Sequence, residues 1–162
     1  MPEIRVGQGF DIHPFSDDPG RRLMLGGVVF DGQGLTGHSD ADVVAHAVTD
    51  ALLGAAGLGD IGQRYPDTDP VHAGVDSMGL LADSVAAVWA DGWEVANVDC
   101  TVVLEAPRLA SRRTEMQEAL TVVVGAAVTV KGKRAEGLGA IGREEGVACF
   151  AVALLTRPGA PS

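Results

Sequence analysis

The sequence predicts an α+β fold: a single domain with a mixed β-sheet and helices packed on one of its faces. Its 162 residues are enough for one compact domain with a sizeable core. Strand-like and helix-like segments alternate along the chain, which favours a sheet packed by helices. Apolar residues make up 46% of the chain and charged residues 21%, which is typical of a globular protein. We assign residues 1–157 to this domain and expect residues 158–162 to form a flexible tail.

The first half of the chain is expected to contain a strand, a hairpin and a helix. The strand covers residues 4–13. The hairpin covers residues 23–30, because Gly26 and Gly27 form a turn between two apolar runs. The helix begins after Ser39 and ends near Gly57, a residue type that commonly ends helices.

The second half of the chain is expected to alternate helices with strands. In order, the elements are a helix over 77–90, a strand over 93–106, a helix over 111–124, a strand over 127–131 and a strand over 147–155. Asp91-Gly92, Pro107 and Gly125 mark three of the ends. Helices on one face leave the other face of the sheet uncovered, and self-association is the economical way to cover it.

Charge and composition exclude several classes of protein. Lysine and arginine number 12 against 22 aspartates and glutamates, which gives a net charge of −10 and argues against a nucleic-acid partner. An anionic substrate would therefore need a local cation, a metal or a helix N-terminus. No secretory leader or membrane-spanning run is recognisable, so we expect a cytoplasmic protein with no membrane partner. Cys100 and Cys149 lie in strand-like segments and are expected to be reduced core thiols.

The helix at residues 38–57 is apolar except for one stripe of polar residues. Ser39 with Asp42 resembles a capping box at its start. Asp42, His46, Thr49 and Asp50 follow helical spacing, so they share one face. A helix that is otherwise apolar is buried, and the stripe therefore faces either solvent or a site. On this helix alone, a histidine beside an aspartate is more often structural than a metal ligand.

Asp11 and His13 in "GFDIHPF" shift the balance towards a metal site. Alternate residues of a strand point the same way, so both side chains can reach one point. With His46 they form a set of two histidines and one carboxylate, which suits Zn²⁺ or a similar divalent ion. Three protein ligands leave a position open, which is the catalytic pattern. The alternative is that Asp11 and His13 are polar residues at the end of a strand.

Three further polar segments carry candidate binding residues. Residues 58–70 contain several aspartates among turn formers, and from the residues alone a surface loop with Asx turns is the preferred interpretation. Residues 104–110 leave a strand through a proline and can present backbone groups to a ligand or serve only as a connector. Residues 131–146 are glycine-rich and basic, so they can cradle phosphate or form a flexible hairpin.

Five motifs together resemble the family of 2-C-methyl-D-erythritol 2,4-cyclodiphosphate synthases. They are "GFDIHPF", "GHSDADVVAHAVTDALLGAAGLGDIG", "YPDTDP", "NVDCTVVLEAP" and "AEGLGAIGREEGVACFAVALL", and they cover nearly the whole chain in order. The resemblance implies an enzyme of the non-mevalonate isoprenoid pathway, a lyase that forms a cyclic diphosphate and releases CMP. It implies a homotrimer whose sheets surround a central axis and whose active sites lie between adjacent subunits.

The resemblance also implies roles for individual residues. Zn²⁺ would be held by Asp11, His13 and His46, and Mg²⁺ or Mn²⁺ on the substrate diphosphate by Glu136. His38 and Arg134 would act on the transferring phosphate. The remaining residues would bind substrate, those of the 104–110 segment from a neighbouring subunit: Ser39, Asp60, Ile61, Gly62, Tyr65, Pro66, Asp67, Thr68, Asp69, Leu104, Glu105, Ala106, Pro107, Arg108, Leu109, Ala110, Lys133, Ala135, Ala140 and Arg143.

The chain departs from the family pattern at two places. Many members have Thr-Thr-Thr-Glu where this chain has Lys133-Arg134-Ala135-Glu136. The guanidinium of Arg134 either contacts phosphate, which we favour, or turns away to pair with an acid. Ala140 replaces a larger aromatic residue of some relatives near the trimer axis, which predicts a wider cavity there.

Two rival functions fit parts of the same pattern. One is a non-catalytic trimer that binds metal or isoprenoid diphosphates on the same scaffold. The other is a metallohydrolase with two histidine ligands, which would release a linear product.

Overall fold

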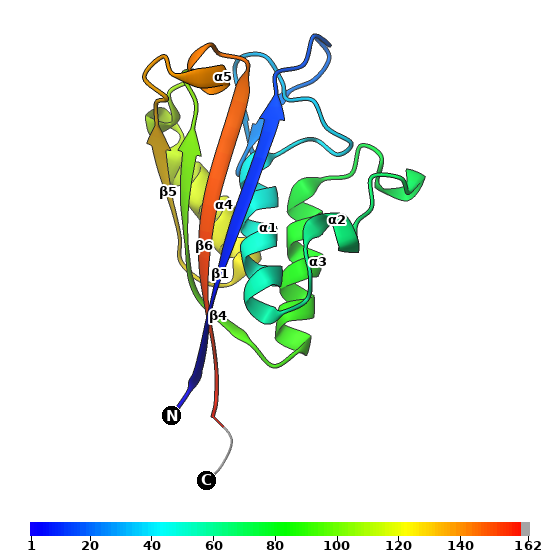
Figure 1. Cartoon of the computed structure of the whole chain (residues 1–162), viewed down its shortest axis with the longest axis vertical. Helices are drawn as coiled ribbons and strands as arrows, with labels where there is room; N and C mark the ends of the chain where they lie inside the picture. The colour runs from blue at the N-terminus through cyan, green and yellow to red at the C-terminus, as the bar shows by residue number, and fades with distance from the viewer. Residues whose placement is uncertain (160–162) are drawn as a thin grey trace.

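A four-stranded mixed sheet with strand order β1-β6-β4-β5 forms the centre of the computed structural model, which describes residues 1–159 (Figure 1). The strands are β1 (Glu3–Pro14), β4 (Glu94–Val103), β5 (Val128–Lys133) and β6 (Gly146–Arg157). β4 and β5 run parallel, whereas β6 is antiparallel to both β1 and β4. The predicted mixed α+β fold is therefore confirmed.

Three long helices cover one face of this sheet: α1 (Val43–Ala56), α3 (Ser77–Ala90) and α4 (Arg113–Val124) (Figure 1). α1 packs against β1 and β6, α4 packs against β5, and α3 packs against the two other helices. Aliphatic side chains and the fully buried Trp93 fill the core between the layers. Cys100 and Cys149 are buried there as free thiols, as predicted.

The remaining elements of the fold are short. The hairpin of β2 (Leu23–Leu25) and β3 (Val28–Phe30) turns at the two predicted glycines. The sequence did not predict the short helices α2 (Ile61–Arg64) and α5 (Gly139–Gly142) or the 3₁₀ turns η1 (Pro70–His72) and η2 (Leu109–Ser111). The strand predicted over 93–106 ends earlier, at Val103, because its partner β6 begins at Gly146 and has almost no residues left to pair.

Two glycines bring β1 into direct contact with α1. A Cβ atom on Gly9 would lie 1.9 Å from the carbonyl oxygen of Ala47, and one on Gly7 would lie 2.0 Å from that of Ala51. Only glycine permits this close approach of strand and helix backbones. The contact places the C-terminal half of β1, which carries Asp11 and His13, beside the first two turns of α1.

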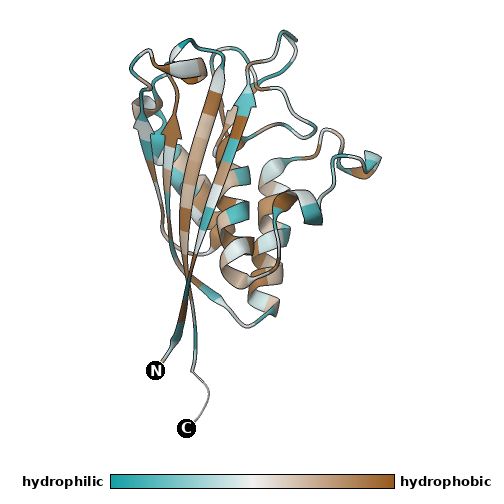
Figure 2. Ribbon diagram, viewed as in Figure 1, coloured by the Kyte–Doolittle hydropathy of each residue, from teal (hydrophilic) through white to brown (hydrophobic). Residues whose placement is uncertain are grey.

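The second face of the sheet carries exposed hydrophobic side chains. Hydrophobic and hydrophilic residues alternate along β1 (Figure 2). The side chains of β1 and β6 that point away from the helices include Ile4, Val6, Phe10, Ile12, Phe150 and Val152, and all six are exposed. The rings of Phe10 and Phe150 lie 4.8 Å apart on this face. The uncovered face predicted from the sequence is therefore present.

Two further observations concern membrane-spanning helices and the C-terminal end of the chain. In the described part of the chain, no helix combines the length and the apolar character needed to cross a membrane. β6 ends at Arg157, and the predicted flexible tail falls largely on residues 160–162, which lie outside the described residues.

Candidate metal centre and substrate cavities

Asp42 positions the helix that carries His46. Its buried carboxylate caps α1 by accepting hydrogen bonds from the backbone N–H groups of Val44 and Ala45, both at 3.1 Å. It also accepts from the N–H groups of Gly26 at 2.8 Å and Gly27 at 2.7 Å. Burial raises the pKa of Asp42, and these backbone hydrogen bonds oppose that rise. One carboxylate therefore ties the start of α1 to the β2–β3 turn.

The helix begins after Ser39, as predicted, but its first residue is Val43 and the predicted capping box starting at Ser39 is wrong. Ala41 has a φ of 58°, so the backbone is not helical there, and Asp42 is the N-cap. The predicted polar stripe does not face one site either. Thr49 Oγ1 donates to the carbonyl oxygen of Ala45 at 2.8 Å, and Asp50 accepts from the N–H of Ile61 at 2.8 Å. Of the four stripe residues, His46 is the one that joins Asp11 and His13.

Asp11, His13 and His46 bring three ligand atoms together. Asp11 Oδ2 lies 2.9 Å from His13 Nε2 and 3.0 Å from His46 Nδ1, and the two ring nitrogens lie 3.2 Å apart. Ligands at zinc-bond lengths in a tetrahedral site are separated by about 3.3 Å. The three atoms therefore nearly form one face of a coordination tetrahedron, and the residues fit a divalent ion such as Zn²⁺.

The outer ring nitrogens of both histidines have partners that orient the rings. His13 Nδ1 lies 2.7 Å from the carbonyl oxygen of Thr36, which can only accept, so Nδ1 carries the proton and Nε2 faces Asp11. His46 Nε2 lies 2.8 Å from Ser77 Oγ, on the side of the ring away from Asp11. Such outer partners are typical of histidines that bind metals.

The cluster requires a positive charge among its ligand atoms. Burial opposes ionisation of Asp11, but hydrogen bonds and charge from His13 and His46 lower its pKa from 3.8 to about 2. Burial likewise opposes the charged form of His13, but its hydrogen bond with Asp11 raises the pKa of the imidazole above 6.5. A carboxylate and two imidazole lone pairs that converge at about 3 Å repel one another unless a proton or a metal ion lies between them.

The cluster opens into a cavity of about 460 Å³. Many of the predicted substrate residues line this cavity with the three ligands: His38, Ser39, Ile61, Gly62, Tyr65, Pro66 and Asp67. Asp60 and Asp69 lie at its border, where Asp60 caps α2 through the N–H of Gln63 at 2.8 Å and the carbonyl oxygen of Asp69 lies 3.4 Å from His38 Nε2. Thr68 is not among the lining residues.

A second cavity, of about 260 Å³, lies between the end of β4 and the end of β5. It is lined by predicted residues Leu104, Glu105, Pro107, Arg108, Leu109, Ala110, Lys133 and Arg134, together with Arg113 and Gly132. Arg134 donates to Glu105 Oε2 from Nε at 3.0 Å and from Nη2 at 2.8 Å. This pairing is the second of the two alternatives for Arg134, and the favoured phosphate contact stays a prediction. Ala106 lines an adjacent hollow with Pro107.

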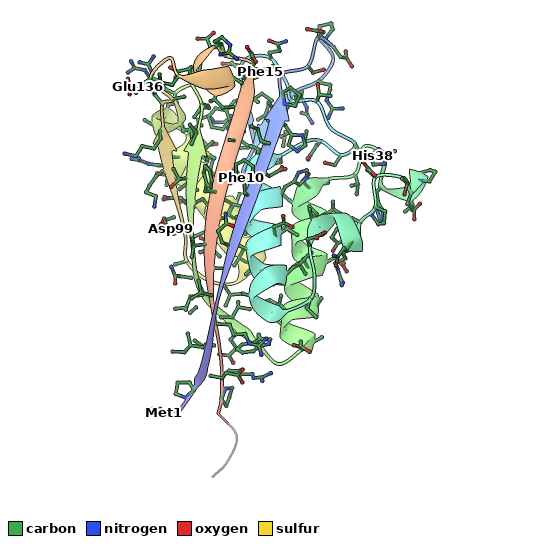
Figure 3. All side chains as sticks on the ribbon, in the orientation of Figure 1. Met1, Phe10, Phe15, His38, Asp99 and Glu136 are labelled. Atoms are coloured by element: carbon green, nitrogen blue, oxygen red, sulfur yellow. The ribbon has the colours of Figure 1, made fainter. Side chains whose placement is uncertain are left out.

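The structure does not bring all predicted site residues of one chain together. His38 and Glu136 lie on opposite sides of the molecule (Figure 3). Ala135, Ala140 and Arg143 belong to the same β5–β6 connection as Glu136, and Arg143 Nε donates to Glu145 at 2.6 Å. Within one chain, the predicted residues around His38 and those of the Glu136 loop therefore do not share one site.

Sequence reasoning missed several residues, among them two polar ones: one lines the metal-cluster cavity and one lies behind His46. His72 lines the cavity and meets the Tyr65 ring edge-on, with ring centroids 5.6 Å apart. Ser77 contacts His46 from 31 residues away. Neither has a spacing that links it to the metal ligands, so no local pattern reveals them.

Comparison with known proteins assigns the chain to a family. The YgbB family profile matches residues 4–156. The chain belongs to the YgbB family. A relative named 2-C-methyl-D-erythritol 2,4-cyclodiphosphate synthase, from Azoarcus sp. (strain BH72), is 54% identical over 95% of this chain and 96% of its own length.

Other YgbB-type relatives include longer proteins and a ligand complex. The bifunctional enzyme IspD/IspF of Anaeromyxobacter dehalogenans (strain 2CP-C) is 52% identical over 95% of this chain, which spans 40% of that protein. A structure described as the CDP complex of Plasmodium falciparum IspF has a TM-score of 0.83 at 32% identity, with 96% of this chain and 97% of that one covered. The match to full-length single-function relatives shows that this fold is a complete unit in them.

Proposed function

We propose that this YgbB-family chain is a 2-C-methyl-D-erythritol 2,4-cyclodiphosphate synthase. It converts 4-diphosphocytidyl-2-C-methyl-D-erythritol 2-phosphate to the cyclic diphosphate and CMP, in the non-mevalonate isoprenoid pathway. The observation that carries the proposal is the Asp11–His13–His46 cluster, whose ligand atoms lie about 3 Å apart at the edge of a cavity of about 460 Å³. Relatives with this activity in their names match this chain over almost their full length.

The reaction is an intramolecular phosphoryl transfer. An oxygen of the 2-phosphate forms a bond to the β-phosphorus, and the bond from that phosphorus to the oxygen bridging it to the α-phosphate breaks. The electron pair of the broken bond stays on CMP. Because the attacking group and its target are both anions, their repulsion is a main obstacle. No protein nucleophile is needed, so the residues act by positioning and by charge.

The residues around the first cavity support a role in holding the reacting end of the substrate. Asp11, His13 and His46 would hold a divalent ion, proposed to be Zn²⁺, which would supply positive charge for the phosphate groups. The exposed His38 and the buried Ser39 line the cavity beside the cluster, where the ring of His38 would donate a hydrogen bond to phosphate and Ser39 would contact the substrate next to it. Asp60 and the Tyr65–Asp69 segment, which includes Thr68, bind the erythritol hydroxyls.

The second cavity is proposed to bind the cytidine half of a substrate held by a neighbouring subunit. Its wall from Leu104 to Ala110 presents backbone groups, and Lys133 and Arg134 supply positive charge. Glu136 would hold Mg²⁺ or Mn²⁺ for the diphosphate, and Ala135, Ala140 and Arg143 belong to the same loop. These cations let a protein of net charge −10 bind a polyanion.

Two features of the single chain support a homotrimer. His38, beside the metal cluster, and Glu136 lie on opposite sides of one chain, so a substrate that contacts both is expected to lie between two chains (Figure 3). The exposed face of β1 and β6 is apolar, which favours burial against identical faces around an axis. Sedimentation equilibrium should give three times the mass of one chain, and a monomer at micromolar concentration would contradict this arrangement. The single-domain boundary at residue 157 and the cytoplasmic location stay predictions.

Release of CMP tests the function directly. Purified protein is incubated with the cytidylyl substrate, Zn²⁺ and Mg²⁺, and the products are analysed by chromatography and mass spectrometry. CMP together with a cyclic diphosphate is the expected result, and His46→Ala should abolish both. Metal binding without CMP would instead support a non-catalytic binding protein. A linear product that has incorporated one water would support a metallohydrolase.

A further inference from the structure

A chain of hydrogen bonds leads from the metal ligand His46 to the carboxylate of Asp40. His46 Nε2 lies 2.8 Å from Ser77 Oγ, and Ser77 Oγ contacts Asp40 Oδ1. Ser77 is fully buried at the start of α3, whereas Asp40 lies in the turn before α1. The chain therefore joins two segments that are distant in the sequence and ends on a residue outside the metal cluster.

The chemistry of the partners sets the direction of these bonds. A carboxylate can only accept, so Ser77 must donate its hydroxyl proton to Asp40. Because its one hydroxyl proton is donated to Asp40, Ser77 Oγ can only accept a hydrogen bond from His46. The ring proton of His46 must therefore be on Nε2. His46 Nδ1 is then a lone pair, and it faces Asp11 Oδ2 at 3.0 Å.

The remaining contacts agree with this direction. Ser39 Oγ accepts from the backbone N–H of Ala41 at 3.1 Å and lies 3.1 Å from His46 Nε2. It also lies 3.2 Å from Ser77 Oγ, to which its own proton can be donated. When Ser39 donates to Ser77 and Ser77 donates to Asp40, neither hydroxyl proton is donated to the ring, and both serine oxygens can accept from Nε2.

Both oxygens of Asp40 are occupied as acceptors. Oδ1 accepts from the backbone N–H of Asp42 at 3.1 Å as well as from the Ser77 hydroxyl. Oδ2 accepts from the backbone N–H of Ser77 at 3.2 Å. An amide in place of this carboxylate would set its NH₂ group against one of those N–H donors, or would donate to Ser77 Oγ and reverse the bond.

We propose that Asp40 and Ser77 are positioning residues that hold His46 in the tautomer whose Nδ1 lone pair binds the metal. The proposal rests on the proposed metal site and goes beyond it by assigning residues that touch neither metal nor substrate. Asp40 and Ser77 act through the His46 ring. If the Ser77 hydroxyl donates to Nε2 instead of to Asp40, the ring proton moves to Nδ1 and occupies the position at which the metal binds. Loss of such outer partners typically weakens metal binding by about 10–100-fold.

The test compares Asp40→Asn and Ser77→Ala with the wild type and with a matched control, Ser84→Ala. Ser84 is equally buried on α3, but its hydroxyl lies 2.9 Å from the Tyr65 hydroxyl and is not part of the network. The His46 tautomer is read from ¹⁵N chemical shifts of the ring nitrogens in metal-free protein at mildly alkaline pH. Zinc affinity is measured by competition with a chelating dye, and circular dichroism checks the fold.

Asp40→Asn should move the ring proton from Nε2 to Nδ1 and raise the zinc Kd by about 10–100-fold. Ser77→Ala should shift the tautomer less completely and raise the zinc Kd by only about tenfold, because Ser39 remains beside Nε2. Ser84→Ala should change neither quantity.

An Asp40→Asn protein with the wild-type tautomer and a zinc Kd within about twofold of wild type would overturn the proposal. If Asp40→Asn does not fold, Ser77→Ala decides by the same two measurements. Failure of the wild type to bind zinc would refute the proposed metal site alone, because the metal-free tautomer still tests the network.

Discussion

Substituting Gly9 by alanine should separate β1 from α1 and dismantle the metal cluster. The new Cβ would lie 1.9 Å from the carbonyl oxygen of Ala47, more than 1 Å closer than real Cβ atoms approach other atoms. The obstacle is helix backbone, which cannot rotate away as a side chain can. β1 and α1 must therefore move apart by about 1 Å, and overpacking of this kind costs about 3 kcal/mol of unfolding free energy.

The same displacement acts on the chemistry. Asp11 and His13 move with β1, whereas His46 stays with α1, so separations of 2.9 to 3.2 Å among the ligand atoms would lengthen. A misplacement of about 1 Å can lower a catalytic rate by about 100-fold. We therefore expect Gly9→Ala to weaken zinc binding and to slow CMP release by about this factor at temperatures where the protein remains folded.

Urea unfolding measures the stability loss, and dye competition measures zinc affinity. Gly54→Ala is the matched control, because it makes the same change within α1 at a position with no neighbouring atom within 4 Å. It should raise the unfolding free energy by about 0.5–1 kcal/mol and leave zinc binding unchanged. A Gly9→Ala protein within about 0.5 kcal/mol of wild type, with unaltered zinc affinity, would refute the reasoning about this contact.

Three further predictions concern the cap, the ion pair and the metal. Asp42→Ala leaves four backbone N–H groups without their side-chain acceptor and should cost about 3–5 kcal/mol in urea unfolding; a loss under about 1 kcal/mol would contradict this accounting. The hydrogen bond from Arg134 holds the pKa of Glu105 below 4.5, so the pair is present above pH 4.5 and is lost as pH falls through the lowered pKa. An NMR titration should show this, and Arg134→Ala should return the Glu105 value towards 4.5. Zinc at 100 times its Kd should stabilise metal-free protein by about 2.7 kcal/mol in calorimetry, and the gain should vanish in His46→Ala if these residues hold the ion.

Much of the fold and of the metal cluster was predictable because it depends on local backbone geometry. Residues two apart in a strand share a side, which placed Asp11 with His13 before any tertiary information. The α1 spacing selected His46 together with three residues that have other roles, because helical periodicity identifies a face and not the neighbours of that face. The capping residue of α1 was misassigned, because Asp42 and not Ser39 is the N-cap.

Contacts between distant segments were beyond local patterns. The network from Asp40 through Ser77 to His46 joins segments that meet only when α3 packs against α1. The pairing of Arg134 with Glu105 likewise depends on β4 and β5 running parallel, which brings the ends of both strands to the same edge of the sheet.

The amino-acid sequence alone thus predicted the α+β class, the acidic character, the glycine turns and the three candidate metal ligands, since each follows from residue type or from the repeat of a strand or helix. Only the tertiary structure decided how these parts act together. The missing side chains of Gly7 and Gly9 let β1 lie on α1, and that contact sets the ligand atoms about 3 Å apart. In the same structure the Glu136 loop lies on the opposite side of the molecule from His38 (Figure 3). One apolar face of the sheet stays uncovered, because helices that pack on one side of a four-stranded sheet cannot bury both of its faces.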